Sequence, residues 1–355
     1  MIIAGIGYAY LGSRQGFRSQ DAISRMQEGA RTAFEIMDKD IRMAGFRGCP
    51  PNDSDINILS SAGDWDKNLI GQPLIGYEKT SGAWSAFPAG VTGVVGAVLR
   101  GDALTVLHAD NSQEFIVSTH TPTPASGPPQ ITLTANHDIK QSSILIAAKA
   151  DCSGTAVFQN TRACTINSSG SCGHAIIEHD ASSPCTSGNS RKGLGSPIGT
   201  TCPDGTTDTF EASSRIYRLS AVTYYIGTNA GTEPALYREV LGAASGSPVT
   251  SAAELIEGVQ DMQLLYGEDT GGAIDKVDVY RTAGNVVDWS RVLGIRVSLL
   301  MVSRQDEQGI TTVPQRYTLD MNGDGDVADT GETVTPTDHL LRKVFTTTIA
   351  VKNRL

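Results

Sequence analysis

The sequence has no excess of positive charge and carries little charge altogether. Its 28 Lys and Arg residues stand against 38 Asp and Glu, which gives a net charge of −10, and only 19% of residues are charged. This balance argues against broad nucleic-acid binding, which needs a basic surface to neutralise phosphates. With 39% apolar residues among 355, the chain is neither disordered nor a multi-span membrane protein. It is long enough for one large or two ordinary domains.

The sequence also lacks the common catalytic signatures. Neither H-E-x-x-H nor G-x-S-x-G occurs. Gly5-Ile6-Gly7 lies in an apolar segment without the preceding strand that a dinucleotide-binding loop needs. His174 and His179 lie near a Ser-rich stretch, but in such a stretch we expect surface-loop histidines rather than hydrolase residues. The sequence therefore predicts no enzyme, no catalytic residue and no organic cofactor.

No C-x-x-C pair is present, although the chain has six cysteines. The disulfide candidates are Cys49, Cys152, Cys164, Cys172, Cys185 and Cys202. The last five lie in a Gly/Ser/Thr-rich stretch that can bury little surface, so crosslinks can substitute for a core. An even number of cysteines in such a stretch favours disulfides and an oxidising compartment.

The pairing of the cysteines is left open by the sequence, because six cysteines allow about 15 combinations. Short loops favour Cys164–Cys172 and Cys185–Cys202, which leaves Cys49–Cys152 to tie the helix base to the rest of the chain. An alternative is a zinc site built from Cys172, His174, His179 and Cys185, whose spacing matches no standard ligand pattern.

The N-terminal segment is apolar but too short to span a bilayer. Residues 1–11 read MIIAGIGYAYL, whereas a spanning helix needs about 20 residues. No basic region precedes it and no small-residue cleavage site follows, so it is a poor signal peptide. We interpret residues 1–11 as the remnant of a longer hydrophobic transmembrane helix.

Proline is absent from residues 12–44, where apolar residues recur mostly every three or four positions. The stripe consists of Phe17, Ile23, Met26, Ala30, Ala33, Phe34, Met37, Ile41 and Ala44. This pattern predicts an amphipathic spine helix over residues 12–47, with charged residues on the other side that include the pairs Glu28–Arg31 and Glu35–Lys39. Gly45 and Gly48 offer helix-ending conformations. The whole element would be about 60 Å long.

The rest of the chain, residues 48–355, has the pattern of a β-rich globular head. Strands are predicted at 103–108, 114–119, 130–134, 143–148, 156–160, 216–225, 235–239, 261–266, 292–302 and 345–351. Residues 252–257 resemble a short helical turn, and 161–214 a Cys-rich insertion. The fold class is therefore α+β, a long N-terminal helix packed on an antiparallel sheet.

An acidic segment near the C-terminus has the spacing of a cation-binding loop. Its candidate metal ligands are Asp320, Asn322, Asp324, Asp326, Asp329 and Glu332. Carboxylate and amide oxygens at alternate positions, followed by Gly325, are suited to wrapping Ca²⁺. Position 12 of the loop is Gly331 rather than Glu, so Asp329 or Glu332 would have to complete the ligand set. The alternative is a solvated acidic turn between two strands.

The segment from Arg18 to Cys49 resembles the post-membrane region of PilW-type minor pilins of the type IV pilus. The family pattern Q-x-x-G/A-R-x-A-x-x-x-(L/M)-x-x-D-(I/L)-R-x-A-G-(F/Y)-x-G-C is matched by Gln27, Arg31, Ala33, Met37, Asp40, Ile41, Arg42, Ala44, Gly45, Phe46, Gly48 and Cys49. Weaker similarities follow in the family's order around 150–159, 255–267, 289–300 and 342–349. The family's basic leader, methylated Phe and Glu five residues into the mature protein are missing here, so we expect the chain to start inside the hydrophobic helix.

The resemblance implies a pilin-like fold and a role in priming pilus assembly at or near the tip. Its implied partners are other minor pilins and the major pilin through the helix, together with a tip adhesin. The implied location is the inner membrane with a periplasmic head, and later the extracellular fibre. Two alternatives remain, a type II secretion pseudopilin and a secreted adhesin or ligand-binding protein.

Overall fold

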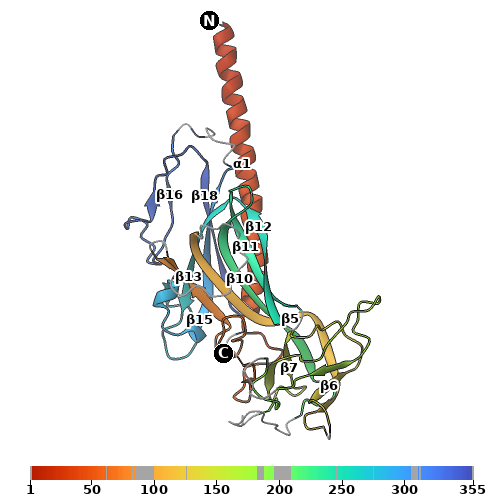
Figure 1. Ribbon diagram of the computed structural model, residues 1–355. Helices are drawn as coiled ribbons and strands as arrows, with labels where there is room; N and C mark the ends of the chain where they lie inside the picture. Colours follow the sequence, from red (N-terminus) through yellow and green to blue (C-terminus); the bar gives the residue numbers. More distant parts are fainter. Residues whose placement is uncertain are drawn as a thin grey trace.

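A long N-terminal helix carries a head built of β-strands (Figure 1). The computed structural model describes residues 2–60, 62–80, 83–84, 100–124, 126–181, 188–195, 209–244, 247–274, 276–304, 311 and 313–353. Helix α1 spans Ile2–Met43, a length of 42 residues. The absence of proline lets it run unbroken. Gly45, with φ of +78°, follows its end in the left-handed conformation that commonly terminates helices.

The strands of the head follow α1 in chain order. They are β1 (Ile56–Asn57), β2 (Leu74–Tyr77), β3 (Lys79–Thr80), β4 (Ala83–Trp84), β5 (Arg100–Thr121), β6 (Gln130–Leu133), β7 (Ile144–Ala148), β8 (Thr155–Gln159), β9 (Ile176–Glu178), β10 (Arg215–Thr228), β11 (Pro234–Ala244), β12 (Ser247–Glu257), β13 (Val259–Glu268), β14 (Val279–Arg281), β15 (Val292–Val302), β16 (Tyr317–Thr318), β17 (Thr333–Val334) and β18 (Arg342–Ala350). Two short 3₁₀ helices, η1 (Ala283–Asn285) and η2 (Trp289–Arg291), precede β15. The prediction of an α+β chain with one long N-terminal helix is confirmed.

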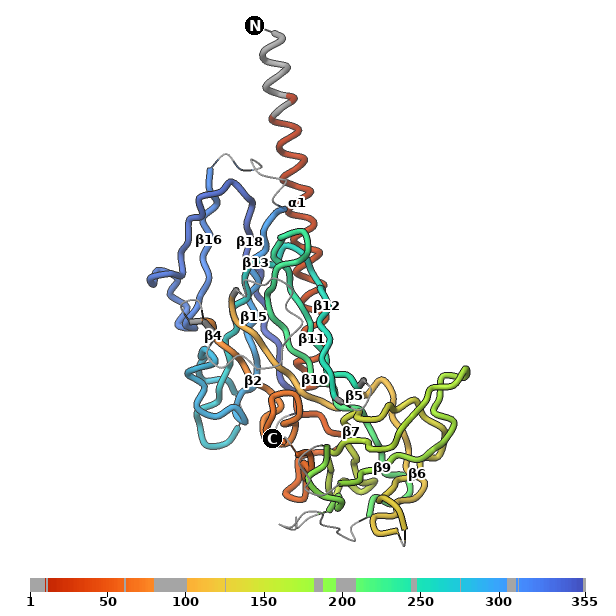
Figure 2. Tube along the Cα trace, viewed as in Figure 1, coloured from red at the N-terminus to blue at the C-terminus, as the bar shows by residue number. Residues whose placement is uncertain are grey.

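Two sheets make up most of the head. The larger one has ten strands, in which β10 pairs with β5, β7 and β11, and β12 extends it beyond β11. The smaller one has the order β14-β13-β15-β18, all antiparallel. Because β5 and β10 are long, they run from the region beside the helix into a second lobe that contains β6, β7 and β9 (Figure 2).

The main core lies where α1 meets both sheets. It joins Met37 and Ile41 of the helix to Val106 and Tyr224 of the larger sheet and Leu299 of the smaller one, all 0% exposed. The second lobe has its own core, centred on buried residues such as Phe158 and Ile177. The helix therefore closes the space between two sheets instead of lying on one.

Three details of the sequence interpretation are wrong. Residues 252–257 are not a helical turn but part of strand β12, which pairs with β11. Arg31 does not pair with Glu28; its Nε lies 3.0 Å from Glu35 Oε1. Phe17 does not belong to the buried stripe, because it is 69% exposed. The 26 − 17 = 9 residues that separate it from Met26 make about two and a half turns, which puts the two on opposite faces.

Among the described residues, no helix is both long enough and apolar enough to cross a membrane.

Candidate assembly helix and its anchor on the head

The C-terminal half of α1 is held on the head by one narrow face. That face consists of Ala22, Met26, Ala30, Ala33, Met37 and Ile41 and is continued by Ala44 just after the helix, each at most 4% exposed. The steps of three and four residues between them keep every side chain on the same side of the helix. At Gly29 the helix comes so close that an added Cβ would lie 3.1 Å from Ile256 Cγ2 and 3.3 Å from Met301 Cε. Small residues therefore let the helix approach β12 and β15.

The N-terminal half of α1 projects beyond the head (Figure 1). Tyr10 is 66% exposed and Phe17 is 69% exposed. An added Cβ at Gly12 or Gly16 would meet no atom within 4 Å. Tyr10 and Phe17 are seven residues apart and so lie on one face of the helix. That face is opposite the one that the head covers in the C-terminal half of α1. The helix thus presents two aromatic side chains to its surroundings.

Asp40 fastens the helix to the larger sheet. It is 4% exposed, and its Oδ2 accepts hydrogen bonds from Tyr224 Oη at 2.6 Å and from Arg238 Nε at 3.0 Å. His108 Nε2 lies 3.6 Å from the other carboxylate oxygen, beyond hydrogen-bonding distance. Burial favours the neutral acid, but the interactions with His108, Tyr224 and Arg238 outweigh it and lower the pKa of Asp40. The same burial, together with the charge of Asp40, raises the pKa of Tyr224.

The segment that follows the helix makes a compact joint with the head. Gly45 donates its N–H to Leu107 O of β5, and an added Cβ there would lie 2.5 Å from Asn353 O. Asn353 in turn donates from Nδ2 to Arg42 O at 3.1 Å. Gly48 has φ of +90°, and an added Cβ would lie 2.6 Å from Tyr217 Cε2. Two of the glycines in the family pattern are therefore explained by close approaches that no side chain could make.

A disulfide and a buried ion pair complete the joint. Cys49 is bonded to Cys152, 103 positions away, with a Cα–Cα distance of 5.4 Å. Arg47 Nη1 lies 3.1 Å from Asp55 Oδ2, and both side chains are 2% exposed. The predicted pairing of Cys49 with Cys152 is confirmed, and it ties the base of the helix to the loop between β7 and β8.

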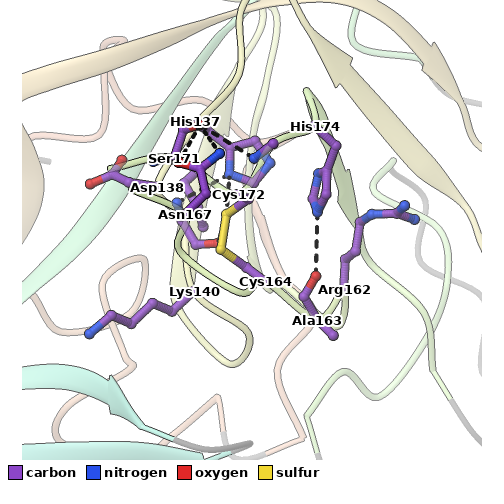
Figure 3. Close-up of a disulfide and its surroundings, with 12 residues drawn as sticks. His137, Asp138, Lys140, Arg162, Ala163, Cys164, Asn167, Ser171, Cys172 and His174 are labelled. Atoms are coloured by element: carbon purple, nitrogen blue, oxygen red, sulfur yellow. Dashed lines mark hydrogen bonds between the residues drawn. A yellow bond between two sulfur atoms is a disulfide. The ribbon is translucent and has the colours of Figure 1, made fainter. Parts of the chain in front are cut away.

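The second predicted disulfide, Cys164–Cys172, is also confirmed and closes a loop of the second lobe (Figure 3). His137 Nδ1 lies 3.4 Å from Cys172 Sγ, while His174 faces Ala163 O. Because Cys172 is oxidised, it cannot serve as a thiolate in the alternative zinc site. Cys185 and Cys202, the predicted third pair, lie outside the described residues.

The structure corrects the expectation that His179 lies in a surface loop. It is 0% exposed, and its Nε2 lies 3.0 Å from His120 Nε2. His179 Nδ1 faces Lys192 O at 2.8 Å and so carries a proton, whereas His120 Nδ1 accepts from Phe210 N at 3.0 Å and carries none. His120 Nε2–H therefore donates to the bare Nε2 of His179. Burial, reinforced by His120, lowers the pKa of His179 to about 3.

The acidic segment forms the hairpin loop between β16 and β17. The loop brings Asn322 together with Asp324 and Asp329. Glu332 folds back onto the backbone of residues 321 and 322. Asp320 instead faces Arg296, and the Asp326 carboxylate accepts a hydrogen bond from the backbone N–H of Ala328. Across the described part of the chain, no group of three or more His, Cys, Asp and Glu side chains is gathered closely enough to hold a metal ion.

Sequence reasoning missed the partners of the anchor. Asp40 is part of the family pattern, but nothing in the pattern names Tyr224 or Arg238 as its partners. Asp40 lies next to the apolar stripe, and this position indicates burial. A buried acid needs hydrogen-bond or ionic partners, so the sequence could have predicted that partners exist. The partners themselves lie 184 and 198 positions away and emerge only when the strands pair.

The fold defines the class of protein: a β-rich head is mounted on a single helix that projects in part beyond it. The family model described as type IV pilus-assembly protein W matches residues 223–353. This match supports assignment of the chain to the PilW family, whose members are components of type IV pilus assembly. The matched range runs from β10 to just beyond β18 and includes Tyr224, Arg238 and Asn353, which hold the helix in place.

No curated protein and no solved structure matches the chain. The family implies an association with the cell envelope or the pilus and an interaction with other pilus components.

Proposed function

We propose that the protein is a minor pilin that primes assembly of a type IV pilus and sits at or near its tip. The observation that carries the proposal is the division of α1 into two halves. Residues from Ala22 onward bury one face on the head, while Tyr10 and Phe17 remain exposed on the projecting half. An exposed aromatic pair on a projecting helix gains free energy when it packs against a neighbour, and each buried aromatic side chain contributes about 1.5–3 kcal/mol.

The neighbours in this proposal are the helices of other minor pilins and of the major pilin. Residues 1–11 act as part of a membrane-embedded helix before assembly, and the rest of α1, from residue 12 to its end at Met43, forms the spine. The β-rich head then faces the periplasm before assembly and lies on the fibre surface afterwards. In this role the protein is structural, and the head needs no catalytic group.

The rigidity of the joint supports this role. Asp40 is held by Tyr224 and Arg238, and Cys49 is crosslinked to Cys152. Because the head is fixed to the helix at both Asp40 and Cys49, the orientation of the helix determines the orientation of the head. That property suits a subunit whose position in a fibre is set by helix packing.

The proposal can be tested by counting pili on cells that carry Phe17→Asp in the full-length gene. The substitution places a charge in the proposed helix–helix contact and leaves the head unchanged, so the number of pili should fall at least tenfold. Val287→Asp is the matched control, because Val287 is 80% exposed on the head. Normal piliation of the Phe17→Asp strain, with the variant present at normal levels, would overturn the proposal.

A further inference from the structure

The hairpin loop of residues 320–332, here called the acidic loop, is docked on the smaller sheet. Asp320 Oδ2 lies 3.6 Å from Arg296 Nη1 of β15. Gly323 has φ of +89°, and an added Cβ there would lie 2.8 Å from Tyr280 O of β14. These contacts hold one side of the loop against the head, so its oxygen atoms are presented from a fixed base.

Two carboxylates of the acidic loop converge on one point. Asn322 Nδ2 donates to Asp324 Oδ2 at 3.0 Å and to Asp329 Oδ2 at 2.9 Å. The side-chain amide NH₂ group of Asn322 therefore lies between the carboxylates of Asp324 and Asp329. A cation at that position would bind the same two oxygens, with Asn322 turning its amide oxygen inward as a third ligand.

Glu332 adds an independent observation at the same loop. Its side chain is 3% exposed, and Oε1 accepts hydrogen bonds from the backbone N–H groups of Met321 at 2.8 Å and Asn322 at 3.3 Å. The other oxygen, Oε2, is buried without a hydrogen-bond partner. Leaving a buried carboxylate oxygen unpaired is costly. The backbone of residues 321 and 322 thus holds the Glu332 carboxylate against the start of the acidic loop, and its second oxygen lacks a hydrogen-bond partner there.

We propose that the acidic loop binds one Ca²⁺ ion through Asn322, Asp324, Asp329 and Glu332. Ca²⁺ accepts six to eight oxygen ligands in flexible geometry, so backbone carbonyls and water complete the set. The full ligand set is not gathered before the ion arrives, which means that binding must draw Glu332 and the Asp324–Asp329 pair together. Binding would therefore stiffen the β16–β17 hairpin where it leans on β14 and β15.

The test is a calcium titration of the full chain after treatment with a chelator, followed by thermal unfolding. A ligand that binds only the folded state raises the Tm, and about a 100-fold excess over Kd should raise it by roughly 5 °C. Calorimetry with CaCl₂ alone should give one site per chain. Glu332→Gln and Asp329→Asn should each lose most of the shift. Asp329→Asn changes an exposed side chain, so it keeps the test valid if Glu332→Gln folds poorly.

Asp151→Asn is the matched control, because Asp151 is an exposed acid outside the acidic loop. Its Oδ1 accepts a local hydrogen bond from Ser153 N. It should keep the full calcium shift. No shift in the parent chain would overturn the proposal, and so would an equal shift in parent and Asp329→Asn. An equal shift with MgCl₂ would overturn the assignment to calcium, since Mg²⁺ requires near-octahedral geometry. None of these outcomes depends on whether the chain assembles into a pilus.

Discussion

The hydroxyl group of Tyr224 donates a hydrogen bond to the carboxylate of Asp40 at 2.6 Å, joining the helix to the centre of the larger sheet. Arg238 from the neighbouring strand adds two contacts to the same carboxylate oxygen. Asp40 is therefore the point at which helix and head are locked in orientation as well as packed together.

Replacing Asp40 by Asn should destabilise the protein by about 2–3 kcal/mol, because Arg238 loses its buried counter-charge while remaining partly exposed. The measurement is the free energy of unfolding in urea. Asp38→Asn is the control, since Asp38 pairs with Arg42 on the exposed side of the helix and should change stability by less than about 0.5 kcal/mol. Equal effects of the two substitutions would show that Asp40 is not an anchor.

The two described disulfides should contribute unequally to stability. Cys49–Cys152 closes a separation of 103 positions and Cys164–Cys172 one of 8. Loop-closure entropy then predicts that replacing both cysteines by Ser costs about 4–5 kcal/mol for the first pair and about 2–3 kcal/mol for the second. Unfolding of the two double variants in urea measures the difference. A larger loss for the short loop would contradict the role of Cys49–Cys152 as the brace of the joint.

The sequence predicted most elements with local signals and missed those that depend on distant contacts. The helix, strand β15 at 292–302 and the two described disulfides follow from periodicity, β-branched composition and cysteine spacing. Residues 252–257 were misread because A-A-E-L-I-E has high helix propensity, whereas pairing with β11 makes it a strand. Phe17 was assigned to the stripe by its apolar character, although its helical angle places it opposite Met26. The buried contact between His120 and His179 joins strand to loop across 59 positions, and no local pattern marks it.

Asp102 should make the protein less stable as the pH rises from about 4 towards neutrality. Burial, opposed by the N–H of Leu264 and reinforced by Glu78, raises the pKa of Asp102 to about 7. Because the folded-state pKa lies above the unfolded value of 3.8, the folded state holds the proton more tightly. Stability must then fall as the pH rises from about 4 to 7, by a few kcal/mol.

Asp102→Asn should remove that decline, because an amide does not titrate. The variant should still fold, because the amide oxygen can accept from Gln263 Nε2 and Leu264 N. The measurement is the free energy of unfolding at several pH values between 4 and 8. Asp110→Asn, on the same strand, is the control, since the pKa of Asp110 is lowered and its contribution changes below pH 4. An unchanged slope in Asp102→Asn would contradict the prediction.

His179 should act in the opposite direction at acid pH. With its pKa lowered to about 3, it stays neutral in the folded state, while the unfolded chain takes up a proton near pH 6.5. Stability must therefore decrease as the pH falls from about 6.5 towards 3. His179→Asn keeps a donor for Lys192 O, lowers stability at pH 7 and should flatten the acid decline. Unfolding curves at pH 7 and pH 5 for parent and variant test this, and an equal decline in both would contradict it.

The most direct measurement of the central claim is photo-crosslinking in cells that assemble pili. A benzophenone amino acid is placed at Phe17 on the projecting helix, or at Val287 on the head as a control, and crosslinked partners are identified by mass spectrometry. If the projecting half of α1 packs beside other pilin helices, the Phe17 position forms adducts with the N-terminal helices of other pilins, and the Val287 position does not. A Phe17 probe that yields no pilin adduct while pili are being assembled would contradict the account.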